Sequence, residues 1–413
     1  MKKYSFSTST CCVSYLPSNL RRLTIASLTL GSLMIGCIPL AQASDIKFSG
    51  FLSVGGGFLD DEDAYSYGNY TEEDLTFDNN LLGLQVSGKI SDELTATAQM
   101  IARSENDYSV TSEWAYLTWQ LSDTTKIRAG RLRTPFYLFS DSLDVGYSYA
   151  WITPPREVYG IPFNNVDGVD IYTTGRLGVF DTSIQAYFGG FTDEVDFDGA
   201  IASTKTRNQM GVAATIGQDW WTFRAAYHQS DLWVDVTQVP LSQTMTIGGF
   251  AQTLSTFGFA KNGNNLLVED DKATFSDVGL TVDTGRFVAA MEHTVMDVKD
   301  SFLSKRIREY VMGGVRAGDW LIHLTFSRSK DESSQPEAGI PSGVALPVIG
   351  STDVLIGTAR AIAQAQVEKR DVITIGTRWD VTSSTALKFQ IDDIDDDSKG
   401  DQKLFSVAIQ TVF

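Results

Sequence analysis

Apolar and polar residues alternate with a period of two along most of the chain beyond residue 45. In the stretch 46–54 one parity is mainly apolar and the other is mainly polar or small, and the same alternation is found in 94–103, 182–188, 210–216 and 320–326. Successive side chains of a β-strand point to opposite faces, so this period predicts strands with one apolar face. The alternation predicts an all-β protein, and by itself it fits a soluble sandwich as well as a barrel.

The lengths of the connections separate these two architectures. Seven short turn segments alternate with eight long polar stretches. These connections would join 16 strands and would place both chain ends on the side of the short turns. An even strand number with tight turns at one end and long loops at the other is typical of an outer-membrane barrel, which must close because lipid cannot satisfy an open sheet edge. We therefore predict a transmembrane antiparallel β-barrel of about 16 strands. A further hairpin in either of two long stretches would raise the count to 18. The long stretches are 59–76, 104–112, 132–165, 189–207, 229–272, 297–305, 330–370 and 392–402, and the extra hairpin would fall in 229–272 or 344–367.

The last eleven residues predict a strand that ends on an aromatic residue. Phe405, Val407, Ile409 and Phe413 share one parity, which is the parity expected to face lipid. This ending resembles the C-terminal signature that the outer-membrane assembly machinery reads. We therefore predict that Phe413 is an assembly signal and that this machinery is a partner of the chain.

The first 43 residues have the pattern of an export signal. Two arginines precede a mostly apolar, uncharged run over 23–38, and Ala41-Gln42-Ala43 supplies the small-x-small pattern that signal peptidase cuts after. The apolar run is shorter than the about 20 residues of a membrane helix. We predict a signal peptide over 1–43, cleaved after Ala43, and a barrel domain over 44–413 located in the outer membrane.

Two alternative interpretations of the N-terminus remain. Met34-Ile35-Gly36-Cys37 is a possible lipoprotein cleavage site, although Met fits its first position poorly, and the long basic stretch before the apolar run would also fit a later start codon. All the cysteines of the chain, Cys11, Cys12 and Cys37, lie in the predicted presequence. The mature chain therefore has none, which excludes a disulfide framework, a thiolate metal site and a cysteine nucleophile.

The mature chain is strongly acidic. The predicted presequence carries four of the 33 basic residues and none of the 51 acidic ones, so the mature chain has a net charge of −22. Nucleic acid is excluded as a partner, because its binding depends on basic side chains that neutralise phosphates. Acidic clusters in the predicted loops would concentrate cations at a pore mouth, hold divalent ions that bridge lipopolysaccharide, or simply keep the loops soluble. These clusters lie at 60–63, 72–74, 193–196 and 392–397.

Two stretches resemble the Gram-negative general porins. Residues 80–88, running through Ser91-Asp92-Glu93-Leu94 to Ala98-Gln99, are similar to the second hairpin of that family, and 126–136 is similar to its fifth strand where it enters loop 3. The resemblance implies a homotrimer of water-filled, 16-stranded barrels in outer-membrane lipid and lipopolysaccharide, with loop 3 folded inward. The chain departs from the family at the basic wall opposite loop 3, where it has Phe51, Leu81 and Glu113.

The connection over 132–165 is the best candidate for a functional segment. A connection of this length in a compact barrel needs a reason, and the inward loop 3 of the resemblance supplies one. Charged groups at a constriction decide ion preference at close range. We predict that acidic residues of loop 3 and basic residues of the facing wall form the constriction. The acidic set is Asp141, Asp144 and Glu157, and the basic set is Arg103, Arg128, Arg131 and Arg133.

The mature chain offers no pattern for catalysis, metal binding or a cofactor. Its histidines, His228, His293 and His323, lie on separate predicted strands with no triad spacing. We predict a porin for passive diffusion of small hydrophilic solutes and ions, with mild cation preference and no enzymatic activity. The alternatives are a substrate-selective porin for a sugar or a phosphate-like anion, and after it a barrel enzyme or an adhesin. The acidic charge argues against the anion channel, whereas aromatic residues of loop 3 would suit a sugar: Tyr147, Tyr149, Trp151 and Tyr159.

Overall fold

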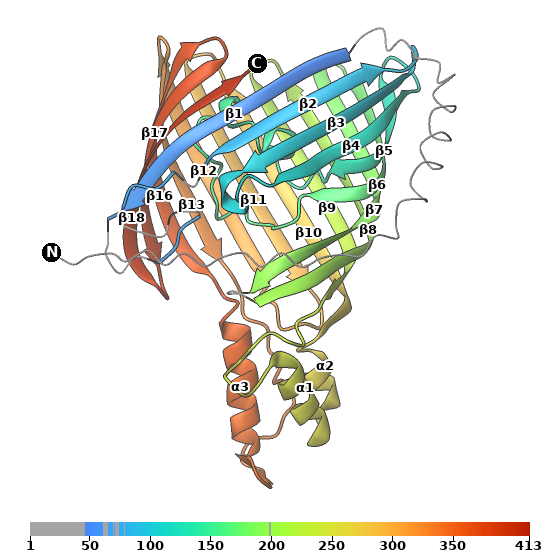
Figure 1. The fold of residues 1–413 in the computed structure, drawn as a ribbon, viewed down its shortest axis with the longest axis vertical. Helices are drawn as coiled ribbons and strands as arrows, with labels where there is room; N and C mark the ends of the chain where they lie inside the picture. Colours follow the sequence, from blue (N-terminus) through green and yellow to red (C-terminus); the bar gives the residue numbers. More distant parts are fainter. Residues whose placement is uncertain (1–45, 61–64, 69, 71–73, 78, 198–199) are drawn as a thin grey trace, which may run out of the picture. The chain divides into compact units, whose positions relative to one another are not determined.

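The computed structural model describes residues 46–413 except 61–64, 69, 71–73, 78 and 198–199, so the predicted signal peptide lies outside the described residues. The described chain forms an antiparallel barrel that closes by pairing the first strand with the last (Figure 1). The prediction of a closed 16-stranded barrel is confirmed. Its strands are β1 (Ile46–Leu59), β2 (Leu81–Lys89), β3 (Leu94–Arg103), β4 (Val110–Gln120), β5 (Thr125–Arg133), β6 (Asn165–Leu177), β7 (Phe180–Phe197), β8 (Ala200–Gln218), β9 (Trp221–Val234), β10 (Val268–Asp283), β11 (Phe287–Val298), β12 (Arg306–Ala317), β13 (Trp320–Lys330), β16 (Lys369–Thr382), β17 (Thr385–Asp396) and β18 (Gly400–Val412).

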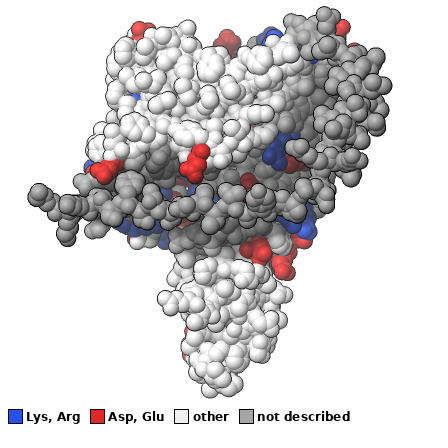
Figure 2. Space-filling model, viewed as in Figure 1, with Lys and Arg blue, Asp and Glu red and all other residues white. Residues whose placement is uncertain are grey.

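The period of two in the sequence becomes an apolar outer face and a polar lumen. In β17, Phe389 and Ile391 are 46% and 42% exposed on the outside, whereas Lys388 and Gln390 point inward and are buried. The face in Figure 2 shows few charged side chains over the strands, and the charges gather towards the strand ends. This is the distribution that a barrel in lipid requires, because only the outward parity meets acyl chains.

Two of the predicted long loops are wrong, because the strands continue through them. β7 and β8 pair as far as Phe197 and Ala200, so 189–207 is mostly a long hairpin, and β17 and β18 pair as far as Asp396 and Gly400. The polar sequence of these stretches predicts loops, but a strand that extends beyond an apolar band carries polar residues on both faces. Polarity excludes contact with lipid there and does not exclude pairing.

Helices account for the two stretches in which an extra hairpin was considered. α1 (Ile247–Thr256) and α2 (Ala260–Asn264) lie between β9 and β10, and α3 (Thr352–Gln364) follows a small hairpin of β14 (Ala345–Leu346) and β15 (Gly350–Ser351). Oxygens of the preceding residues cap two of these helices: Thr246 accepts from the Gly249 amide, and Ser351 from the Asp353 amide. The strand number therefore stays at 16. None of the helices in the described chain has the length and apolarity needed to cross a membrane.

The helices pack on the long-loop ends of the strands. Phe250 and Leu254 of α1 and Leu355 and Ala359 of α3 share an apolar cluster with side chains from β9, β10 and β11, including Val298. Because these positions recur three or four residues apart, each helix turns one apolar stripe towards the others. The helices project beyond the long-loop ends of the strands (Figure 1).

We expect a charge on the outer face to destabilise the barrel in lipid. Ile375, near the middle of β16, is 55% exposed and pairs with the outward residues Leu324 and Ile391. Ile375→Arg should lower the free energy of unfolding in lipid vesicles by about 2–4 kcal/mol. Val348→Arg adds the same charge at a fully exposed hairpin tip and should change stability by less than about 0.5 kcal/mol. Equal losses in urea titrations of the two variants would contradict a lipid-facing surface.

Candidate functional site: a loop folded into the barrel

The connection between β5 and β6, residues 134–164, is folded into the lumen and is called loop 3 from here on. It contains two short 3-10 helices, η2 (Ser140–Ser142) and η3 (Gly146–Ser148), and it has few regular backbone hydrogen bonds of its own. Its polar groups are instead satisfied by the barrel wall, through side chains of β9, β11, β12, β13, β16, β17 and β18. The predicted inward loop 3 is thus present in the structure.

Two cations of the wall hold the backbone of loop 3. Lys388 of β17 is 1% exposed, and its ammonium group donates to three loop 3 carbonyls at 2.5 to 2.7 Å. Arg378 of β16 donates to two carbonyls at 2.6 and 3.0 Å. A lysine has three donors, so this ammonium is fully satisfied although it is buried. The carbonyls bound by Lys388 are those of Gly146, Tyr149 and Trp151, and those bound by Arg378 are those of Tyr147 and Tyr149.

A second attachment lies on β9 and β11. Glu292 accepts a hydrogen bond from the backbone amide of Leu138 at 2.8 Å and from the hydroxyl of Tyr159 at 2.5 Å. Arg224 donates to the carbonyl of Phe136 at 3.1 Å and pairs with the carboxylate of Asp277. Buried charges are tolerated when they are paired and hydrogen-bonded in this way. The start and the end of loop 3 are therefore tied to the same part of the wall.

Aromatic packing fills the space between loop 3 and the wall. Trp151 is 1% exposed, lies 5.5 Å from the ring of Tyr310 between centroids, and donates its indole N–H to Thr325 Oγ1 at 2.8 Å. Tyr137 and Phe275 meet edge to face at 5.4 Å. Such contacts stabilise beyond simple burial. They make the middle of loop 3 a small hydrophobic core inside the lumen.

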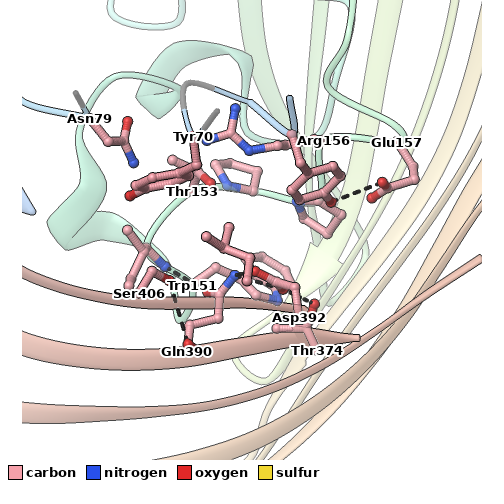
Figure 3. Close-up of a pocket in the computed structure, with 15 residues that line it drawn as sticks. Tyr70, Asn79, Trp151, Thr153, Arg156, Glu157, Thr374, Gln390, Asp392 and Ser406 are labelled. Carbon is pink, nitrogen blue, oxygen red and sulfur yellow. Dashed lines mark hydrogen bonds between the residues drawn. The ribbon is translucent and has the colours of Figure 1, made fainter. Parts of the chain in front are cut away.

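Glu157, predicted at the constriction, is buried and forms a structural attachment. Its two oxygens accept hydrogen bonds from the hydroxyls of Tyr67 and Ser327, both at 2.9 Å, and Arg308 donates to its backbone carbonyl at 3.1 Å. Figure 3 shows Glu157 at the end of loop 3, on the same side of the small cavity as Arg156, with Asp392 across from it on the wall. Its carboxylate is therefore engaged and does not face an open path.

Asp144, also predicted at the constriction, lies in a compact ion cluster with two of the predicted wall arginines. Arg103 binds Asp144 at 2.7 Å and Glu113 at 2.7 Å, and Arg133 also binds Asp144. Burial raises the pKa of Asp144, but Arg133 and Arg103 outweigh it and hold the pKa of this carboxyl below its usual range. The cluster has two cations and two carboxylates, so its charges balance.

The remaining predicted site residues, Asp141, Arg128 and Arg131, lie in three different environments. Asp141 is exposed, with Arg128 close enough to act on it electrostatically. Arg128 pairs with the buried Asp170 at 2.5 Å. Arg131 binds Asp167 at 2.9 Å, and Asp167 shares its parity with exposed outer residues of β6, so this pair lies on the outside of the barrel and not on the pore wall as predicted. The outer residues are Val169 and Ile171.

The sequence prediction found Arg103 and Arg133 but missed five further basic residues that contact loop 3. It noted that the basic wall of the resembling family is replaced by Phe51, Leu81 and Glu113, but cations stand on other strands instead. Each occupies an inward-facing position of a strand far along the chain from loop 3. The sequence shows that such a basic residue points inward, but it does not show that loop 3 is the segment it contacts. These residues are Arg224, Arg308, Arg370, Arg378 and Lys388.

The histidines do not converge in the structure. His228 bonds the hydroxyl of Tyr187 at 2.9 Å inside the barrel, His293 pairs with Glu309 at 3.1 Å on the outer parity, and His323 is buried near Trp151. Over the described residues, no group of three or more His, Cys, Asp or Glu side chains is arranged to hold a metal ion.

No protein-family model and no curated protein sequence matches the chain. Among solved structures, the outer-membrane expressed OmpT of Vibrio cholerae matches with a TM-score of 0.53 at 12% identity over 89% of this chain and 97% of that chain. The trimer form of OmpT matches with a TM-score of 0.51 at 11% identity over 89% and 99%. OmpF of Salmonella typhi, in complex with daunomycin, matches with a TM-score of 0.53 at 14% identity over 89% and 97%. At these identities the likeness shows the fold, which is that of a porin-like outer-membrane barrel.

Proposed function

We propose that this protein is an outer-membrane porin, through which small hydrophilic solutes and ions diffuse passively. One observation carries the proposal: the lumen contains a long connection, and polar and charged side chains of the wall hold its backbone in place. Gln390 and Gln410 bind the amide and the carbonyl of Ile152 at 3.1 and 2.8 Å. A barrel whose interior is polar around an inward loop suits a water-filled, constricted channel.

The same proposal includes export and assembly. A signal peptide over 1–43 would deliver the chain to the outer membrane, where its partners would be lipid, lipopolysaccharide and the assembly machinery. A homotrimer is consistent with the trimer form of the similar barrel of Vibrio cholerae. The likeness to porin structures also supports a channel without enzymatic activity.

We propose mild cation preference, which the charge of the lumen supports. Asp144 and Glu113 are balanced by Arg103 and Arg133, so the exposed Asp141 retains the unbalanced charge on this side of loop 3. The net charge of −22 on the predicted mature chain adds a diffuse negative potential. Two unit charges 4 Å apart interact by about 4 kcal/mol at an effective dielectric of 20, so one unpaired carboxylate biases permeation.

The reversal potential of single channels in a salt gradient tests this proposal. Wild-type channels should reverse on the cation side. Asp144→Asn should shift the reversal potential strongly towards anions, because it removes one carboxylate and leaves Arg103 and Arg133 undercompensated, and Asp141→Asn should shift it in the same direction. Asp92→Asn changes the same charge in an exposed short turn and should have little effect. Absence of conductance would contradict the porin, whereas a wild-type reversal potential on the anion side would contradict only the cation preference.

A sugar-selective porin is the second candidate. The aromatic residues of loop 3 that suit a sugar slide are Tyr147, Tyr149, Trp151 and Tyr159, but Trp151 and Tyr149 are at most 6% exposed. Tyr159 also donates its hydroxyl to Glu292. These contacts favour packing of loop 3 over an exposed aromatic path.

A further inference from the structure

A largely apolar recess opens in the lumen on the long-loop side of loop 3. Phe136 and Phe163 of loop 3 line it together with inward side chains of β9, β10 and β11, among them Leu232, Phe275 and Val298, and it encloses about 220 Å³. We call it the vestibule recess. It shares no lining residue with the ion cluster of Asp144 or with the carbonyls that Lys388 holds.

Arg306, the first residue of β12, supplies the one charge that lines the recess within the described chain. Its guanidinium has no ion pair or hydrogen bond with any described residue. Asp331 and Glu368 act on it electrostatically, but each is already bound by Arg308, at 3.1 and 3.0 Å, and Glu368 is also bound by Arg370 at 2.8 Å. Arg306 is thus left as a cation without a direct partner next to an apolar surface.

Some uncharged polar groups of the recess are hydrogen-bonded, whereas Nε2 of His228 is buried without a partner. Thr206 donates to Gln209 at 2.7 Å, Gln209 donates weakly to Thr134 at 3.4 Å, and Tyr187 bonds His228. A guanidinium beside an apolar wall is costly unless it gains an anionic partner. The recess therefore combines one guanidinium that lacks an anionic partner with apolar surface around it.

We propose that the vestibule recess binds a small monoanionic amphiphile, a carboxylate on an aromatic or branched apolar body. The carboxylate would accept hydrogen bonds from two parallel N–H groups of Arg306. The apolar body of the ligand would pack against Phe136, Phe163 and Phe275. Inorganic phosphate fits less well, because it offers no apolar surface and its second charge is opposed by Asp331 and Glu368. A sugar fits less well because it carries no charge to pair with Arg306. Binding at this site does not depend on the ion preference of the channel.

Calorimetric titration of the folded, detergent-solubilised barrel with 2-naphthoate tests this site. We expect saturable binding of 2-naphthoate, and little or no saturable binding of 2-naphthamide, which keeps the ring without the charge, or of acetate, which keeps the charge without the ring. Loss of a charged hydrogen-bond pair should weaken 2-naphthoate binding to Arg306→Gln roughly ten- to hundredfold. Phe163→Ala should weaken it by removing part of the apolar wall.

Arg286→Gln is the matched control, since it removes the same charge from the exposed turn between β10 and β11 and should bind like the wild type. Heat-modifiable migration on gels identifies variants that have not folded, and only folded variants are compared. Equal binding of 2-naphthoate and 2-naphthamide, unchanged binding by folded Arg306→Gln, or no saturable binding by the wild type would each overturn the proposal. Conductance is measured separately, so a barrel that conducts ions without binding 2-naphthoate contradicts the recess alone.

Discussion

Deletion of Phe413 is expected to remove most of the folded barrel while leaving export intact. The backbone of Phe413 closes the barrel against Gly50, with N–H to O distances of 3.0 and 2.8 Å in the two directions. Its ring lies over Gly50, where an added Cβ would come within 2.6 Å of it, and the residue is 66% exposed on the outer face. Both the end of the closing pair and the exposed aromatic proposed as an assembly signal disappear in the deletion.

The measurement is the amount of heat-modifiable barrel in outer-membrane fractions, set against the total amount of exported chain. Phe413→Ala keeps the two backbone hydrogen bonds and removes the ring, so it separates recognition of the aromatic from closure of the strand. Phe413→Tyr should assemble almost normally. If the deletion left the amount of heat-modifiable barrel unchanged, Phe413 would have no role in assembly.

Lys388→Met is expected to release loop 3 and to raise single-channel conductance with added current noise. Methionine has a similar shape but no donors, so two of the three buried carbonyls lose their only wall cation, and each unsatisfied group costs about 1–3 kcal/mol. The carbonyls of Gly146 and Trp151 have lost their bond to the wall cation, whereas Arg378 keeps its bond to Tyr149. The barrel itself should persist, because its strand pairing does not involve this side chain.

Lys403→Met is the matched control for this variant. Lys403 lies in β18, is 46% exposed and pairs with Asp393, so its loss removes the same charge without touching loop 3. Lys388→Arg should restore part of the wild-type conductance, because a guanidinium still donates to carbonyls. A folded Lys388→Met channel with wild-type conductance and noise would show that the ammonium group does not hold the constriction.

The sequence was sufficient for the barrel and insufficient for the contacts of its interior. Alternation over stretches such as 94–103 specifies a strand with one apolar face whatever its neighbours are, so strand number and pairing order followed from local pattern and turn length. The extent of the strands did not, because Asp193 and Asp395 look like loop residues but are paired beyond the apolar band.

The partners of loop 3 could not be predicted for a different reason. Asp144 was expected at a constriction and lies near Arg133, 11 positions away along the chain, and near Arg103, 41 positions away on β3. Lys388, by contrast, lies 242 positions from Gly146. Only closure of the whole barrel brings such residues together. A local sequence pattern therefore cannot predict that they are in contact.

The attachment of loop 3 to the last strands also constrains the order of folding. Ile152 bonds Gln410 across 258 positions, and Tyr147 reaches Ser383 across 236. Contacts between such distant positions are formed late, because the loss of chain entropy must be offset by structure already present. Loop 3 can therefore reach its final position only after β16, β17 and β18 have joined the sheet. Insertion of loop 3 is therefore expected to be a late step in the folding of this barrel, after its sheet has closed.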